Sequence, residues 1–392
     1  MHLFFENIIR ILVNLWSGKF KNLDVGTEDY EIPANMWDEI WRETAEGMRD
    51  IPADFIRSMG SGPGSLTAEA WCFWFTYLAP ILLKGRFNHP KYHQHLCDFS
   101  DIIKTCINFT LTHAQIETLR DHIITWVETY ERFYYQYAEE RLSACPLRYC
   151  GFLKGALSSK TSPWANLNNI VLHRAYLEQL EALYDLTDEL ASPNQRTNGL
   201  SSSEFQYEHY PQTVLRLPCQ KTYAPDVSLR RKIGVYFAAL LGKTIREIEP
   251  QLPEVMARWG KVRIVDGDSI ASAWVLARRN EAARNTSVIR VSVHWIPQTC
   301  YGRLDEIVVC KIPPDQVRLL AVITPYKTGG KDAALGIVFH SQPLIQIVAD
   351  IQSIMAVVGR IQSQGKWYIV DRTGGMVRPE FIPGDEGDEE DE

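Results

Sequence analysis

The chain changes its periodicity where it reads Lys261-Val262-Arg263-Ile264-Val265-Asp266. Before this stretch, apolar residues recur every three or four positions, as they do along one face of a helix. After it, they fall into short runs rich in β-branched residues and separated by Gly, Pro and Asn, which is typical of strands. The sequence therefore predicts an α+β fold, with helices first and strands after residue 261.

Six apolar runs predict strands in a β-rich module that spans residues 259–382. Short strands at this spacing, separated by turns, are typical of a small antiparallel β-barrel. An acidic tail, residues 383–392, follows the module and is expected to be disordered. The predicted strands are residues 262–266, 270–277, 288–295, 307–312, 319–324 and 367–371.

A helical region is predicted over residues 1–190. It begins with amphipathic patterns at residues 2–16, 35–48, 67–83 and 113–142. Thr112 and Gln115 have the spacing of a capping box, which marks the start of the last of these helices. We expect its apolar stripe to pack in the core, and a platform for stacking bases is the alternative. The stripe consists of Ile116, Leu119, Ile123, Val127, Tyr130, Tyr134 and Tyr137.

The helical region and the β-rich module are separated by two further segments. Residues 191–225 are rich in Ser, Asn, Gln and Pro, which predicts a linker. Residues 226–258 are predicted to form a pair of short helices, 228–241 and 245–258. Gly242 is suited to end the first of them.

The composition is that of a globular protein. Of the 392 residues, 45% are hydrophobic and 23% charged, which excludes a largely disordered chain. The 8 cysteines form no Cys-x-x-Cys pair, so neither a zinc ribbon nor a disulfide framework is predicted. Reduced thiols favour a nuclear or cytoplasmic location.

The net charge of −7 argues against a strong nucleic-acid binder. Residues 385–392 alone carry seven negative charges, however, so the rest of the chain is neutral. A neutral body can still present a basic face. We therefore keep nucleic-acid binding as one of two interpretations.

Membrane insertion and nucleotide chemistry are not predicted. The most apolar stretch, residues 70–83, is shorter than the roughly 20 residues that cross a bilayer, and it contains Pro80. Neither a P-loop nor a Gly-x-Ser-x-Gly elbow occurs, and no small-molecule substrate is evident.

Several motifs spread over almost the whole chain share one resemblance. They are Met1-His2-Leu3-Phe4-Phe5-Glu6-Asn7, Trp71-Cys72-Phe73-Trp74-Phe75, Tyr130-Glu131-Arg132-Phe133-Tyr134-Tyr135, Ser162-Pro163-Trp164-Ala165-Asn166-Leu167-Asn168-Asn169 and Val262-Arg263-Ile264-Val265-Asp266-Gly267-Asp268-Ser269. Together they resemble the CACTA (En/Spm-type) DDE transposases in their fungal form. The resemblance implies that the helical region is a remnant of an RNase H-like catalytic domain.

The resemblance also implies that catalysis is lost. Transposases of this family hold two magnesium ions with three carboxylates. Their glutamate precedes an Arg-Tyr pair, and at Cys145-Pro146-Leu147-Arg148-Tyr149-Cys150 that place is taken by Leu147. A His-rich stretch of the family is absent at this junction, and the family's aspartate precedes the segment that starts at Met1. We therefore predict no catalytic residue, no metal site and no cofactor.

Basic side chains near aromatic ones are the candidate nucleic-acid contacts, because cations bind phosphates and rings stack on bases. Such clusters are also common on ordinary solvated faces, which is the alternative interpretation. The candidates are Lys154, Lys160, Trp164, Arg230, Arg231, Lys232, Arg278 and Arg279, with Arg284 close to the last two.

Two segments have residue types that metals prefer. His89, His93, His95 and Cys97 lie within nine residues, but a zinc site needs four converging ligands, and a surface turn before a helix explains the pattern equally simply. The Asp-Gly-Asp sequence at residues 266–268 resembles part of a calcium loop and is more typical of a turn.

The sequence thus predicts a transposon-derived protein without DDE catalysis that retains contacts to DNA, to itself or to another transposon-derived protein. One alternative is an interaction module, centred on the β domain, that binds a chromatin or transposition partner. Another is a fragment of an intact DDE transposase. Salt separates the first two, because binding to DNA phosphates weakens steeply with ionic strength.

Overall fold

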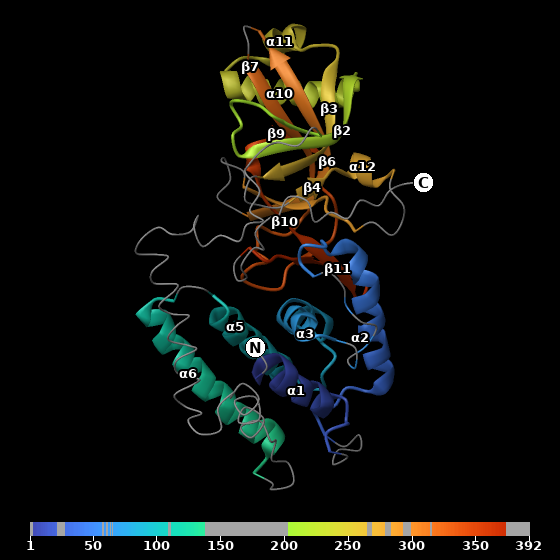
Figure 1. The fold of residues 1–392 in the computed structure, drawn as a ribbon. Helices are drawn as coiled ribbons and strands as arrows, with labels where there is room; N and C mark the ends of the chain where they lie inside the picture. Colours follow the sequence, from blue (N-terminus) through green and yellow to red (C-terminus); the bar gives the residue numbers. More distant parts are fainter. Residues whose placement is uncertain are drawn as a thin grey trace, which may run out of the picture.

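A computed structural model places a helical region against a strand-rich region (Figure 1). We refer to residues 3–137 as the helical region and to residues 203–373 as the β region. The structure describes residues 3–21, 28–56, 66–108, 111–137, 203–264, 269–278, 284–292, 299–313 and 316–373, together with Met59, Gly62 and Gly64.

The helical region forms around large aromatic side chains, because its apolar residues recur at helical spacing and bury one face of each helix. Trp16, Trp71, Trp74 and Phe75 are fully buried in this core. The helices are η1 (Leu3–Ile8), α1 (Ile9–Trp16), α2 (Ala34–Gly47), η2 (Met48–Asp50), α3 (Ala68–Phe73), η4 (Trp74–Leu78), α4 (Ala79–Leu82), α5 (Pro90–Cys106), α6 (His113–Tyr130) and η5 (Glu131–Tyr135). All four predicted helices of this region are present.

The capping box at the start of α6 is confirmed. The backbone N–H of Gln115 donates to Thr112 Oγ1 at 3.3 Å, and the backbone N–H of Thr112 donates to Gln115 Oε1 at 2.8 Å. The predicted end at residue 142 was wrong, because Gln136 and Tyr137 have positive φ angles of 50° and 57° and the helix stops at Tyr135.

The predicted core stripe of α6 is only partly correct. Tyr134 is fully buried, but four other members are between 38% and 70% exposed: Ile116, Ile123, Val127 and Tyr137. The helix lies at the outer edge of the helical region, beside α5 (Figure 1). It turns Trp126 inward, so the side that bears Ile116 and Val127 faces outward.

The β region contains two sheets, and every strand pair in its described part is antiparallel. The larger sheet curls into a half-barrel and consists of β1 (Glu204–Gln206), β2 (Thr213–Tyr223), β3 (Met256–Ile264), β4 (Ser269–Ala271), β5 (Val288–Ser292), β6 (Thr299–Ile312), β7 (Gln316–Pro325), β9 (Ile347–Asp350) and β10 (Ile354–Val357). The smaller sheet consists of β8 (Phe339–His340), β11 (Gly359–Ser363) and β12 (Lys366–Val370). The predicted α+β class is confirmed, while the descent of the helical region from an RNase H-like domain stays a prediction.

Five of the six predicted strands correspond to β3, β5, β6, β7 and β12. The sixth was wrong beyond Ala271, since the chain turns there into the short helix α12 (Ala273–Leu276).

The predicted linker contains two strands, β1 and β2, that the sequence analysis missed. Polar residues and Pro218 made this stretch resemble a loop, but β2 pairs with β3 along most of its length. The register shifts between Arg216 and Cys219, where the proline lies, and again between Gln220 and Tyr223. Hydrogen bonding to a strand whose paired residues lie 33 to 51 positions later overrides the local composition.

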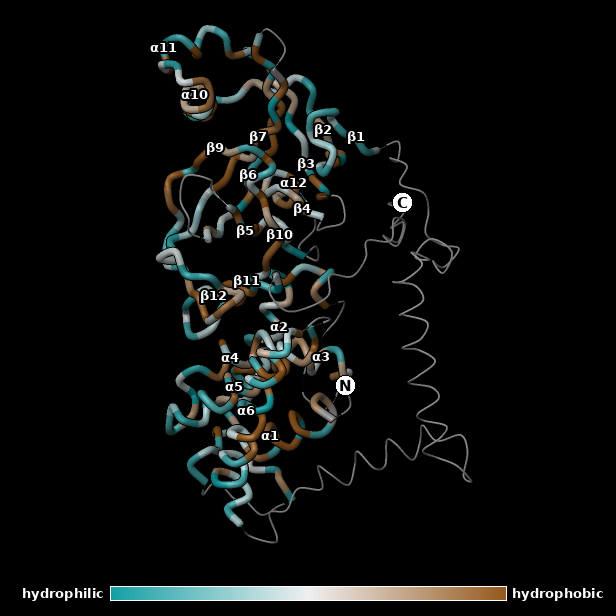
Figure 2. The backbone as a smooth tube through the Cα atoms, turned by 90° about the vertical axis from the view of Figure 1, so that its left-hand side faces the viewer, coloured by the Kyte–Doolittle hydropathy of each residue, from teal (hydrophilic) through white to brown (hydrophobic). Residues whose placement is uncertain are grey.

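One face of the larger sheet is covered by α10 (Val227–Leu241), whose Ile233 and Phe237 are fully buried against β6 and β7. The next predicted helix, 245–258, is shorter than expected. It comprises α11 (Ile245–Ile248) and the turn η7 (Glu249–Gln251), after which β3 begins. Figure 2 shows α10 and α11 at the end of the molecule opposite to α1 and α6.

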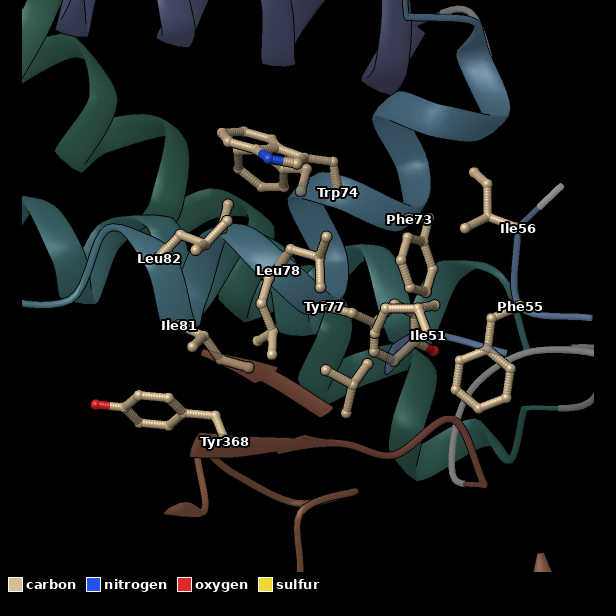
Figure 3. Packing of buried hydrophobic residues seen from close by; sticks show 14 of the residues in the cluster. Ile51, Phe55, Ile56, Phe73, Trp74, Tyr77, Leu78, Ile81, Leu82 and Tyr368 are labelled. Atoms are coloured by element: carbon tan, nitrogen blue, oxygen red, sulfur yellow. The ribbon is translucent and has the colours of Figure 1, made fainter. Parts of the chain in front are cut away.

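A continuous hydrophobic core joins the helical region to the smaller sheet. Figure 3 shows Ile51, Tyr77 and Ile81 gathered over the strand that carries Tyr368. A glycine on each side, Gly47 in the helical region and Gly359 in the smaller sheet, allows the two to pack closely. A Cβ atom on Gly47 of α2 would lie 2.6 Å from Ile361, and one on Gly359 of β11 would lie 2.7 Å from Ile51.

Among the described residues, no helix combines the length and the hydropathy that a membrane span requires.

Candidate nucleic-acid interface

Charge is distributed very unevenly along the chain. Residues 203–373 carry 22 Lys and Arg against 15 Asp and Glu, a net charge of +7. Residues 1–202 carry 18 against 25, a net charge of −7. Averaging over the whole chain hid this contrast from the sequence analysis, which found no strong basic footprint. The β region by itself has the charge sign of a nucleic-acid-binding domain.

The short helix α12 lies directly on β3 and carries Trp274, with Arg278 two residues after its end. The Ser272 amide and hydroxyl both donate to the Gly260 carbonyl at 2.9 Å, which fixes the start of α12. A Cβ atom on Gly260 would lie 2.4 Å from Val275 Cγ2 and 2.6 Å from Pro218 Cδ. Glycine at position 260 is therefore what allows α12 to approach the strand.

Arg258 of β3 links aromatic rings from two elements. Its guanidinium carbon lies 4.0 Å from the ring centre of Tyr223 and 4.1 Å from that of Trp274 on α12. It donates to Glu306 at 2.9 Å and to Gln220 at 2.6 Å. These contacts orient the guanidinium and with it the Trp274 ring.

Arg278 extends this arrangement to the surface. Its guanidinium carbon lies 4.9 Å from the Trp274 ring centre, and its side chain is exposed. An arginine stacked on a ring uses the face of the guanidinium and leaves its in-plane N–H donors for a phosphate. We call the set Tyr223, Arg258, Trp274 and Arg278 the arginine–aromatic column.

The protonation state of Tyr223 is consistent with a stable arginine–aromatic column. Burial and, to a smaller extent, the hydrogen bond with Glu306 together raise the pKa of Tyr223 to about 12. The phenol is therefore neutral at physiological pH. The inner end of the column accordingly contains one cation, Arg258, and one carboxylate, Glu306.

The predicted contacts on α10 have separate roles. Arg230 donates to the carbonyls of Pro253 at 2.7 Å and Leu252 at 2.6 Å, so it holds the end of η7 against the helix. The Lys232 ammonium donates to Gln346 at 2.8 Å. The sequence analysis grouped Arg230, Arg231 and Lys232 as one basic cluster. In the structure, Arg230 and Lys232 hydrogen-bond to other parts of the β region, and Arg231 is exposed.

Arg284 does not face outward either. Its guanidinium donates to the carbonyls of Ile56 and Pro52, which joins the β region to the helical region, and burial lowers its pKa. Four predicted contacts lie outside the described residues: Lys154, Lys160, Trp164 and Arg279.

The histidine-rich segment serves packing. His93 Nε2 lies 2.8 Å from the Pro80 carbonyl, and His95 Nε2 lies 3.2 Å from the Trp126 carbonyl. The His95 ring stacks on the Trp126 ring, and burial lowers the pKa of His95 to about 4. The structure as described contains no group of three His, Cys, Asp or Glu side chains that could hold a metal, and residues 266–268 lie outside it.

Two carboxylates do approach each other, Asp332 and Asp371, but a cation already bridges them. Arg290 donates to each of them at 2.8 Å, and the Tyr301 hydroxyl donates to Asp371 at 2.8 Å. The single positive charge of this guanidinium is shared between the two carboxylates and offsets one of their two negative charges. The arrangement does not fit a pair of magnesium ions of the kind that intact transposases hold with three carboxylates.

Family models, curated proteins and solved structures were each compared with this chain, and none matches it. The sequence analysis named Arg278 but missed the residues that hold it. The spacing of Trp274 and Arg278, four positions apart, is the one local signal of their contact. Tyr223 and Arg258 are brought to them only by the pairing of β2 with β3.

Proposed function

We propose that this chain is a DNA-binding protein, derived from a CACTA-type transposase, that does not cleave DNA. The observation that carries the proposal is the net charge of +7 on the β region, in a chain whose total charge is −7. DNA phosphates attract such a surface at long range, and each neutralised phosphate releases counterions that favour binding.

Exposed cations on the β region supply the contacts. Arg278 at the outer end of the arginine–aromatic column is the one whose orientation the structure explains. A guanidinium held on a ring loses less side-chain entropy when it binds a phosphate than a free one does. The exposed Lys and Arg side chains of the described β region include Lys221, Arg231, Lys243, Arg246, Arg278, Lys311, Lys327, Lys331 and Lys366.

The acidic residues that the structure describes support binding without cleavage. Two-metal catalysis needs several carboxylates around a common point, and no described residues form such a group. Leu147, in the place of the family's glutamate, supports the same conclusion by resemblance. We therefore propose no magnesium-dependent step for this chain.

The test is a salt titration of DNA binding by the full chain. Fluorescence anisotropy of a short labelled duplex of mixed sequence should give an affinity that falls steeply between about 50 mM and 200 mM salt. A plot of the logarithm of the binding constant against that of the salt concentration should have a slope of several units. An absence of binding at the lower salt concentration would refute the proposal.

A second candidate function is protein binding through the β region. Ile345 is 84% exposed. Leu344 beside it and Ile347, the first residue of the short strand β9, are also exposed. Exposed apolar residues in succession favour an apolar partner surface. Binding of that kind does not weaken as salt is raised, which separates it from DNA binding.

A further inference from the structure

We infer that the acidic segment 385–392 of this chain binds the basic surface of the β region and competes there with DNA; the inference rests on the proposed function. Residues 374–392 carry eight Asp and Glu and one Arg, a net charge of −7. That charge is equal in magnitude and opposite in sign to the charge of residues 203–373. The tail and the β region are therefore electrostatically complementary.

The acidic segment resembles a DNA strand in the spacing of its charges. Residues 385–392 read Asp-Glu-Gly-Asp-Glu-Glu-Asp-Glu, with a carboxylate at every position but one. An extended chain advances about 3.3–3.6 Å per residue. Phosphates advance about 3.4 Å along each strand of duplex DNA. Successive side chains of an extended chain point to opposite sides, so the segment would present two rows of carboxylates, and a surface that binds phosphates can bind either row.

The segment starts from a fixed point on the β region. Asp371 accepts hydrogen bonds from Arg290 and Tyr301, and the amide of Thr373 donates to Asp371 at 2.9 Å. The 12 residues from Thr373 to Asp385 span at most about 40 Å. A domain of the size of the β region has a radius of gyration of about 16 Å, so the acidic segment can reach a large part of its surface.

Because the acidic segment is covalently joined to the β region, even a weak attraction is enough for it to occupy the binding surface. A segment joined by a short linker has an effective concentration on the order of millimolar at its binding surface. DNA in solution must displace it, and the apparent affinity of the chain for DNA falls accordingly. The charges act through solvent, so the competition weakens as salt is raised.

The experiment replaces all seven acidic residues of the segment with their amides in the full chain. The length is unchanged, and residues 3–373 keep their sequence. At about 50 mM salt we expect the variant to bind the labelled duplex about tenfold more tightly than the wild type, and the difference should shrink at about 200 mM. The substitutions are Asp385→Asn, Glu386→Gln, Asp388→Asn, Glu389→Gln, Glu390→Gln, Asp391→Asn and Glu392→Gln.

A matched control separates tail binding from a general effect of net charge. Neutralising three exposed carboxylates of α6, with Glu117→Gln, Asp121→Asn and Glu128→Gln, changes the net charge as much as neutralising three in the tail. If the tail occupies the DNA-binding surface, Asp385→Asn, Glu386→Gln and Asp388→Asn together tighten DNA binding clearly more than the three substitutions on α6. Equal effects would overturn the inference.

A labelled peptide of residues 374–392, added to the chain with the neutral tail, tests contact directly. We expect it to bind and to be displaced by the duplex. If both forms of the chain bind DNA equally and the peptide does not bind, the inference is wrong and the proposed function stands. If the peptide binds but neither form binds DNA, the proposed function fails while the contact of the tail with the β region stands.

Discussion

The Glu43 carboxylate on α2 accepts a hydrogen bond of 2.8 Å from the Ser363 hydroxyl on β11, 320 residues later in the chain. The same carboxylate accepts from the Arg86 guanidinium at 2.8 Å and from the Gln364 amide at 3.1 Å. Glu43 and Arg86 are both buried. One carboxylate therefore joins two helical segments to the smaller sheet.

Replacing Glu43 should destabilise the whole chain. Glu43→Ala leaves the buried Arg86 guanidinium and the Ser363 hydroxyl without this acceptor, and we expect a loss of about 3 kcal/mol in the free energy of unfolding. Urea unfolding followed by tryptophan fluorescence measures it. Glu46→Ala on the same helix is the control, because Glu46 pairs with Arg42 on the surface and should contribute less than about 1 kcal/mol. Equal effects would show that Glu43 does not join the two regions.

The position of α12 on β3 should depend on Gly260. Gly260→Ala introduces a Cβ atom that overlaps Val275 and Pro218, so α12 and Trp274 are displaced and both stability and DNA affinity fall. We expect a loss of roughly 1–3 kcal/mol in the free energy of unfolding. Gly336→Ala is the matched control, since a Cβ atom there meets nothing within 4 Å. A variant at position 260 that is as stable as this control would contradict the packing.

Much of the fold could be predicted from local signals. The pair Thr112 and Gln115 specifies a helix start within four residues, and the structure has it there. The strand β2 was missed because its Ser-, Gln- and Pro-rich surroundings resemble a loop, while the hydrogen bonds that make it a strand come from β3. The exposure of Ile116 and Val127 could not be predicted either, since a helical stripe indicates an apolar face but does not say that a neighbour covers it.

The candidate site was less predictable than the fold. Arg278 was named from a cluster of basic residues, but the role of Arg258 depends on Tyr223 and Trp274, which lie 35 positions before it and 16 after it. Arg230 was grouped with its basic neighbours, and only the structure shows that it binds backbone carbonyls. The charge of the β region became visible once its boundaries were known, because residues 1–202, with a net charge of −7, cancel it in the sum.

Acid should destabilise the chain through two buried histidines. Burial lowers the pKa of both His95 and His340 to about 4, whereas an unfolded histidine has a pKa of about 6.5. Between these values the unfolded state binds more protons, so stability falls as the pH is lowered from about 6.5 to about 4. The loss is of the order of 1.4 kcal/mol per pH unit for each histidine.

The measurement is the urea midpoint as a function of pH. His95→Gln keeps a donor for the Trp126 carbonyl and removes the titrating group, so its curve should be flatter in this window than that of the wild type. His113→Gln is the control, because His113 is exposed at the start of α6. Parallel curves for His95→Gln and the wild type would show that His95 is protonated equally in both states.

Magnesium should not enable DNA cleavage. The guanidinium of Arg290 already bridges Asp332 and Asp371, and among the described residues no group of three candidate metal ligands is found. Incubation of the full chain with supercoiled plasmid and magnesium or manganese should leave the plasmid intact, as judged by gel electrophoresis. Nicking that is abolished by a chelator, and absent from a mock purification, would contradict the prediction.

Arg278 should contribute directly to DNA binding and little to folding, because its side chain is exposed and stacks on Trp274 at one end only of the arginine–aromatic column. Arg278→Ala should weaken binding of the labelled duplex about fivefold and reduce the salt slope by about 1, while the urea midpoint is unchanged. Lys19→Ala removes an exposed cation from the acidic helical region and should alter neither quantity. If the two variants bind DNA equally well, DNA contacts other side chains of the β region, and the arginine–aromatic column serves only to hold α12 on β3.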